Sequence, residues 1–159
     1  MKTLPGFAII LCALLVLAGG CAKNTGAAAT PHKHEHHPPH GGTPVVLGDE
    51  IYHLELVLDA ATGKLQVFVL DGEMENFIRS AELTVEIDAT VNGQPRKVVL
   101  SAVANPATGE TVGDTSLFEG QEDWLKTAKD FDAVLKTITI RGTTFTDVKF
   151  NYPKGNDTD

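Results

Sequence analysis

Short runs of alternating apolar and polar residues fill the chain from Val45 onward, and glycine, asparagine, aspartate or proline separates them at short intervals. This pattern is typical of β-strands joined by tight turns. Eight such strands without long helices between them indicate an all-β fold, which we expect to be an immunoglobulin-like β-sandwich of about seven or eight strands. The strands are predicted near residues 44–47, 51–59, 64–71, 81–91, 96–103, 115–118, 133–141 and 144–151.

Residues 119–131 depart from this alternation, because Trp124, Leu125, Ala128 and Phe131 recur at helical spacing. The spacing predicts one short helix that closes the sandwich. An apolar set of this kind is far more often core packing than a ligand pocket, so we assign Trp124 no functional role.

The second strand and the hairpin that follows it allow a register to be predicted. A four-residue loop pairs Asp59 with Lys64, which lays the leucines of the two strands opposite one another and sets His53 against Leu70. His53 and Glu55 then point away from the leucine face. Two interpretations stay open for them: they form half of a metal site, or His53 is an exposed strand histidine without a role.

The first 20 residues are predicted to be a signal peptide, with a positive Lys2 followed by an apolar run over residues 7–17. The run ends in Leu-Ala-Gly-Gly-Cys, which resembles the lipobox of bacterial lipoproteins and implies that Cys21 is lipidated. Ala18 stands where that family more often has leucine, and ordinary cleavage that leaves a free thiol at Cys21 is the alternative. By the same resemblance, Ala22 favours delivery to the periplasmic face of the outer membrane in the bacterial cell envelope.

Composition limits the remaining chain to one ordinary domain. We expect a lipidated, flexible, histidine-rich tether over 21–43, the β-sandwich over 44–153 and a disordered tail over 154–159. Both cysteines precede the predicted domain, so no disulfide framework supports it. The formal net charge of −8 disfavours nucleic acid as a partner and attracts cations.

Five of the six histidines fall within nine positions of the tether, between Pro31 and the Gly41-Gly42 pair, with Pro38 and Pro39 among them. Neutral imidazole is the commonest protein ligand for borderline metals, so this density indicates capture of a divalent ion such as zinc, nickel or copper(II), with no organic cofactor. A polar spacer without metal is the competing interpretation, because proline and glycine also keep a linker extended. The candidate ligands are His32, His34, His36, His37 and His40, with His53 and Glu55 completing the shell from the folded domain.

One stretch of the chain also resembles a known domain. His40-Gly41-Gly42, Tyr52-His53-Leu54-Glu55 and Val69-Leu70-Asp71 are similar to the histidine-bearing leader domain of some adaptor (membrane-fusion) subunits of heavy-metal efflux systems. The resemblance covers roughly residues 37–75 and implies an envelope setting and a link to metals, with His40 and His53 as the positions carried over. The long hairpin and barrel modules of such adaptors have no counterpart here, so pump assembly is not implied.

Catalysis has little support, because the predicted domain offers one histidine, no cysteine and no glycine-rich phosphate loop. We therefore expect a protein that is not an enzyme. The favoured function is an envelope-anchored lipoprotein that binds or delivers a divalent transition metal, held to the membrane by its lipid and acting with a metal-efflux or other envelope protein. The alternatives are a structural or assembly lipoprotein whose domain binds another envelope protein, and an accessory that responds to pH through its histidines.

Overall fold

Eight antiparallel strands and one short 3-10 helix form the folded part of the protein, and the computed structural model describes residues 37–157. The helix η1 spans Asp123–Lys126. The strands are β1 (Thr43–Leu47), β2 (Tyr52–Asp59), β3 (Lys64–Asp71), β4 (Thr84–Val91), β5 (Gln94–Ala102), β6 (Leu117–Gln121), β7 (Phe131–Ile140) and β8 (Thr143–Tyr152).

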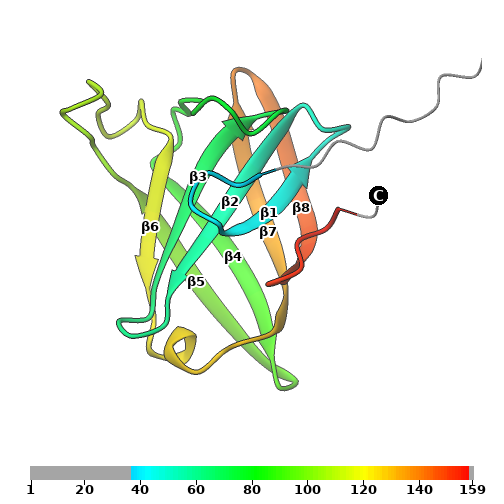
Figure 1. Cartoon of the computed structure of the whole chain (residues 1–159). Coiled ribbons are helices and arrows are strands. Elements are labelled where there is room, and N and C mark those ends of the chain that lie inside the picture. The colour runs from blue at the N-terminus through cyan, green and yellow to red at the C-terminus, as the bar shows by residue number, and fades with distance from the viewer. Residues whose placement is uncertain (1–36, 158–159) are drawn as a thin grey trace, which may run out of the picture. The chain divides into compact units, whose positions relative to one another are not determined.

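All eight strands belong to a single sheet in the order β1-β2-β3-β6-β5-β4-β7-β8. The sheet curls until its two edge strands, β1 and β8, approach one another (Figure 1). The all-β class and the strand number are confirmed. The arrangement differs from a sandwich of two packed sheets, because β6 pairs with both β3 and β5 and thereby joins the two halves of the chain into one nearly closed sheet.

Alternation along the strands gives this sheet an apolar interior. In β3, for example, Leu65, Val67 and Val69 are buried while the residues between them are partly exposed. Removal of such side chains from water is the main favourable term in folding. The largest fully buried side chains of the interior are Leu47, Leu54, Leu56, Leu65, Ile87, Leu100, Phe118, Leu125, Leu135, Ile138 and Ile140.

The register predicted for the β2–β3 hairpin is confirmed. Asp59 pairs with Lys64 and His53 pairs with Leu70. Within the loop, the backbone N–H of Gly63 donates to the carbonyl of Asp59 at 2.8 Å, and Gly63 has a φ of +73°, the left-handed conformation that glycine tolerates. The hairpin therefore fixes which residues of β2 face the interior.

The helix predicted over residues 119–131 is only four residues long in the structure. The first part of that range continues β6, where Glu119 pairs with both Gln66 and Ser101. Pairing on both sides satisfies the backbone there, and β7 begins at Phe131, so only residues 122–130 remain for a helix. The prediction that these side chains pack in the core is confirmed for Leu125, Ala128 and Phe131.

The segment after β8 closes the seam between the edge strands and corrects the prediction of a disordered tail from residue 154. The side chain of Asn156 accepts a hydrogen bond from the backbone N–H of Val46 at 2.7 Å and donates one to its carbonyl at 3.1 Å. Gly155 is buried against Pro44, where an added Cβ would lie 2.1 Å from the carbonyl oxygen. The Asn156 amide thus substitutes for a neighbouring strand at the edge of β1.

Candidate functional site

A turn at residues 38–42 lies against the outer face of β2 and sets His40 in place. The backbone N–H of Gly41 donates to the carbonyl of Pro38 at 3.0 Å, which closes the turn. Gly42 passes so close to β2 that an added Cβ would lie 2.5 Å from the carbonyl oxygen of Leu56. The flexible tether predicted over 21–43 is therefore held to the domain at its last residues.

The carboxylate of Glu55 fastens this turn. One oxygen accepts hydrogen bonds from the backbone N–H groups of His40 at 2.7 Å and Gly42 at 2.9 Å, and the other contacts Nδ1 of His40 at 2.8 Å. The Glu55 side chain is fully buried, whereas that of His40 is 40% exposed. Both oxygens of Glu55 are therefore engaged in orienting the turn.

His53 lies two residues from Glu55 on the same face of β2, as the predicted alternation requires. It is fully buried, with a relative exposure of 0%. The interpretation of His53 as an exposed strand histidine is therefore wrong. Its strand partner Leu70 is fully buried as well, so this part of the outer face is covered rather than solvated.

Three rings form an aromatic cluster beside Glu55. The imidazole of His40 stacks on Phe68 with ring centroids 4.0 Å apart and an interplanar angle of 17°. Phe77, from the connection between β3 and β4, lies with its centroid 5.9 Å from both rings. Phe68 is the strand partner of Glu55, so the β2–β3 register brings the carboxylate and the stacked ring to the same face.

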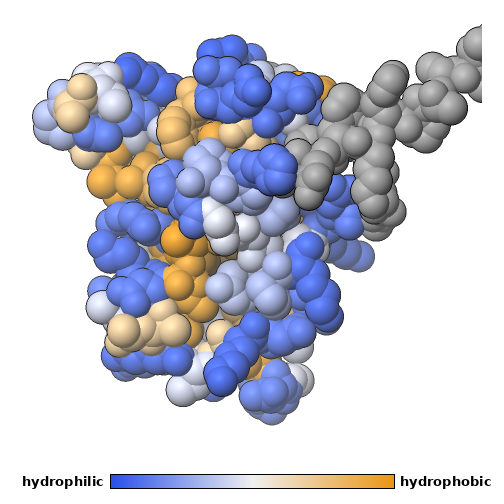
Figure 2. Space-filling model, in the orientation of Figure 1, coloured by the Kyte–Doolittle hydropathy of each residue, from blue (hydrophilic) through white to orange (hydrophobic). Residues whose placement is uncertain are grey.

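A pocket of about 340 Å³ opens between this aromatic cluster and the loop over residues 103–116. In the orientation of Figure 1, hydrophobic surface is visible between that loop and the body of the sheet (Figure 2). The polar side of the pocket is lined by Arg79, Asn105, Thr108, Glu110 and Ser116. The pocket is thus apolar and aromatic on one side and strongly polar on the other.

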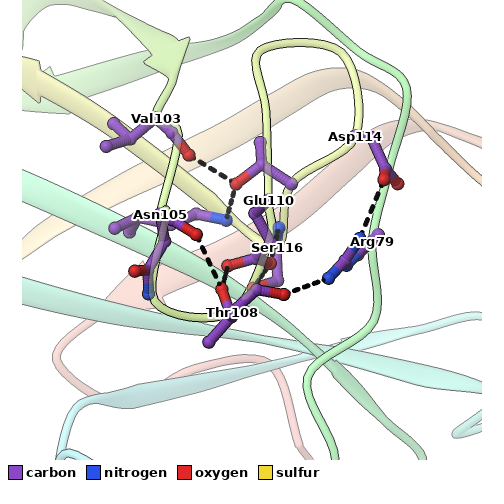
Figure 3. A network of polar contacts seen from close by, with 9 residues as sticks. Arg79, Val103, Asn105, Thr108, Glu110, Asp114 and Ser116 are labelled. Atoms are coloured by element: carbon purple, nitrogen blue, oxygen red, sulfur yellow. Dashed lines mark hydrogen bonds and ion pairs between the residues drawn. The ribbon is translucent and has the colours of Figure 1, made fainter.

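The loop owes its shape to a network of polar contacts around Glu110 (Figure 3). One carboxylate oxygen accepts from the backbone N–H and the hydroxyl of Ser116 at 2.9 and 2.7 Å, and the other accepts from the hydroxyl of Thr108 at 2.7 Å. Arg79 ties the loop to the β3–β4 connection, donating to the Thr108 carbonyl at 2.6 Å and to Asp114 at 2.9 Å. Glu110 therefore holds the loop from within, and Arg79 holds it from the β3–β4 connection.

Glu110 is only 7% exposed, and its ionisation reflects two opposing effects. Burial alone raises the pKa of this carboxyl, but hydrogen bonds donated by Ser116 and Thr108, together with the charge of Arg79, hold the pKa below its ordinary value. The group is therefore a carboxylate at neutral pH, with its acceptors occupied by the loop itself.

The predicted metal ligands are distributed unevenly. His37 is exposed, His40 lies at the surface, and His53 and Glu55 are buried beneath it. The remaining predictions, which concern Cys21, His32, His34 and His36, lie outside the described residues. Within residues 37–157, no group of three or more histidine, cysteine, aspartate or glutamate side chains has a metal-binding arrangement.

Sequence reasoning missed the aromatic cluster and the braced loop. The position of Phe68 could have been predicted, because the predicted register already placed it opposite Glu55. Phe77, Arg79 and Glu110 gave no comparable signal. Arg79, for example, contacts the loop at Thr108, 29 residues further along the chain.

No family model, curated protein or solved structure matches this chain. In residues 37–157, no helix has the length and apolarity needed to cross a bilayer.

Proposed function

We propose that this protein is an envelope-anchored lipoprotein that binds a divalent transition metal, with His40 as the ligand supplied by its folded domain. The single observation that carries the proposal is the contact between Nδ1 of His40 and the buried carboxylate of Glu55 at 2.8 Å. Lipid attachment at Cys21 and a position on the periplasmic face of the outer membrane belong to the same proposal and rest on the leader sequence.

The chemistry follows from the donor and acceptor roles of the two groups. An ionised carboxylate can only accept hydrogen bonds, so its partner Nδ1 carries the proton. In the neutral ring, Nε2 then holds the lone pair, which is the form that ligates a metal. Histidine ligands of metals typically donate their second ring N–H to a carboxylate in this way, which orients the ring and raises its basicity.

This arrangement gives Glu55 a different role from the one that its sequence position suggested. Its oxygens already accept three hydrogen bonds from the turn, and its side chain is fully buried. We therefore propose that Glu55 positions His40 and does not contact the ion, and that His53, fully buried beside it, is also outside the ligand set.

The rest of the coordination shell then comes from the tract that enters the turn. His37 is exposed three residues before His40, and His32, His34 and His36 precede it at short intervals. A tethered tract of imidazoles next to one fixed imidazole gains affinity from its high effective concentration. Nitrogen ligands without thiolate or thioether suit zinc, nickel or copper(II).

Calorimetric titration of a soluble form, residues 22–159, with zinc, nickel and copper(II) tests the proposal. We expect one ion per chain, with affinity lowered at least tenfold by His40→Ala and by Glu55→Gln. Because His53 is proposed to lie outside the ligand set, His53→Ala should leave the metal affinity unchanged. Circular dichroism establishes which variants retain the fold. Weak binding at several sites that is indifferent to His40 would overturn the proposal and leave a polar spacer.

A second candidate function is a structural or assembly lipoprotein that binds another envelope protein. Two apolar side chains, Leu83 and Val112, favour this function, because each is 61% exposed. They lie on neighbouring connections, since a Cβ added to Gly113 would lie 3.6 Å from the side chain of Leu83. Large apolar side chains gathered at a surface are typical of protein contacts. Under this function, Leu83→Ser together with Val112→Ser abolishes partner binding, whereas His40→Ala leaves it unchanged.

A further inference from the structure

The pocket that His40 and Phe68 line has the construction of a small-molecule site, and its polar groups can act on a ligand without a metal ion. Its volume of about 340 Å³ is at the lower end of the range of ligand pockets, which typically combine apolar walls with a few convergent polar groups. Both walls are ordered before a ligand binds, because the Glu55 carboxylate positions His40 and the Glu110 carboxylate positions Ser116. A ligand that enters would therefore find the site largely formed.

The apolar wall selects for a flat group. His40 and Phe68 are stacked nearly parallel, and Phe77 stands at 47° and 55° to them at a centroid distance of 5.9 Å. Phe77 is 49% exposed, so a large part of an aromatic side chain faces solvent at the pocket. Aromatic pairs favour stacked or tilted contacts of this kind, and a planar ring placed against Phe77 extends the cluster by one member.

The polar wall selects for negative charge. The Glu110 carboxylate is already saturated by the loop, so it offers little to a ligand. Asn105 uses its Oδ1 to accept from the N–H of Ala107 at 3.1 Å, which leaves its amide N–H groups as the part it offers. Arg79 has five N–H donors in a planar fork and is 40% exposed. The groups available to a ligand are therefore donors.

We propose that this pocket binds a small planar aromatic carboxylate, with its ring against Phe77 and Phe68 and its carboxylate on the guanidinium of Arg79. Arginine binds carboxylates in a bidentate geometry that is both stronger and more specific than a contact with lysine. Of the two groups that now accept from Arg79, the Thr108 carbonyl belongs to the loop, whereas Asp114 has a 55% exposed side chain that a ligand carboxylate can replace.

Binding of benzoate to the same soluble form, residues 22–159, is measured by titration monitored through backbone amide chemical shifts. A chelator is present so that metal plays no part. We expect saturable shifts at Thr108, Ser116 and Phe77, with a dissociation constant on the order of 1 mM for a ligand of this size. Benzamide, which has the ring without the charge, is expected to bind at least tenfold more weakly.

Two variants separate ligand binding from support of the loop. Arg79→Gln removes the guanidinium and is expected to weaken benzoate at least tenfold. Asp114→Asn breaks the same ion pair but keeps the guanidinium, so it is expected to bind benzoate as well as the wild type or better. Absence of saturable shifts, equal binding of benzamide, or equal losses in the two variants would each overturn the proposal.

The result of the benzoate titration does not depend on the result of the metal titration. Benzoate binding in the presence of chelator supports the pocket even if His40 ligates no ion, and tight metal binding leaves the pocket proposal untouched. Phe77→Ala provides the matching test of the apolar wall, with a loss of affinity expected for benzoate.

Discussion

Glu55 holds His40 from a distance of fifteen residues along the chain, through hydrogen bonds of 2.7 Å to its backbone nitrogen and 2.8 Å to Nδ1. A buried carboxylate is costly unless donors surround it, and here all of the donors come from one turn. The charge and the turn therefore stabilise each other, and loss of either leaves the other without its partner.

Replacement of the Glu55 carboxylate tests this dependence. Glu55→Gln puts an amide N–H group among donors that need an acceptor, so we expect a loss of about 2 to 3 kcal/mol in the free energy of unfolding. Urea denaturation measures the loss. Glu86→Gln is the matched control, because Glu86 pairs with Lys97 on the exposed outer surface and its replacement should change stability little. Equal effects of the two substitutions would contradict the role given to Glu55.

The close approach of Gly42 to β2 predicts a local effect of substitution. In Gly42→Ala the new methyl group would meet Leu56 at 2.5 Å and the side chain of Glu55 at 2.8 Å, so the turn should leave the strand. The readout is the ring-current shift that Phe68 imposes on the His40 ring protons, which should disappear.

Gly41→Ala is the control for this experiment. Gly41 has a φ of +68° and no atom within 4 Å of an added Cβ, so the substitution carries only the cost of a left-handed backbone, about 1 kcal/mol. The His40 shifts should survive in this variant. Retention of those shifts in Gly42→Ala would show that the turn tolerates the methyl group.

The Glu110 network predicts a loss of stability in acid. Because the pKa of Glu110 is lower in the folded protein than in the unfolded chain, its contribution is fully present above about pH 4.3 and is lost as the pH falls through the folded pKa. Amide hydrogen exchange of Ser116 should accelerate in that range beyond the intrinsic pH dependence of exchange. In Glu110→Gln the exchange should be fast at neutral pH and lack the acid step, whereas an unchanged acid step would assign it to another group.

The contact between Asn156 and Val46 predicts how the sheet is closed. Asn156→Ala removes one acceptor and one donor from the edge of β1, which should cost about 1 to 2 kcal/mol and speed exchange of the Val46 amide roughly tenfold. Lys154→Ala serves as the control, since that side chain is 73% exposed and should leave Val46 protected. Equal protection of Val46 in both variants would show that β1 and β8 close the seam without Asn156.

Local patterns were sufficient for the parts of the fold that depend on neighbouring residues. The β2–β3 register could be predicted because alternation and the length of one loop determine which residues meet. The same reasoning placed His53 and Glu55 on one face. It could not show that both are buried, because the turn that covers Glu55 is held by contacts that only the folded chain creates.

Contacts between distant segments explain the differences. Insertion of β6 between β3 and β5 turns two expected sheets into one, yet nothing in the sequence of Leu117–Gln121 indicates its neighbours. The link from Arg79 to the loop at Thr108 spans 29 residues, and the link from Asn156 to Val46 spans 110. Short-range periodicity carries no information on pairings of this length.

The contact between β1 and the segment after β8 has a consequence for biogenesis. The edge of β1 is completed by the side chain of Asn156, 110 residues later in the chain. During synthesis or translocation, β1 therefore has an open edge until Asn156 has also emerged. An open edge is a template for pairing with other chains. The domain is therefore most exposed to chaperones, and to misassembly, during the interval between the synthesis of its first strand and the arrival of its last residues.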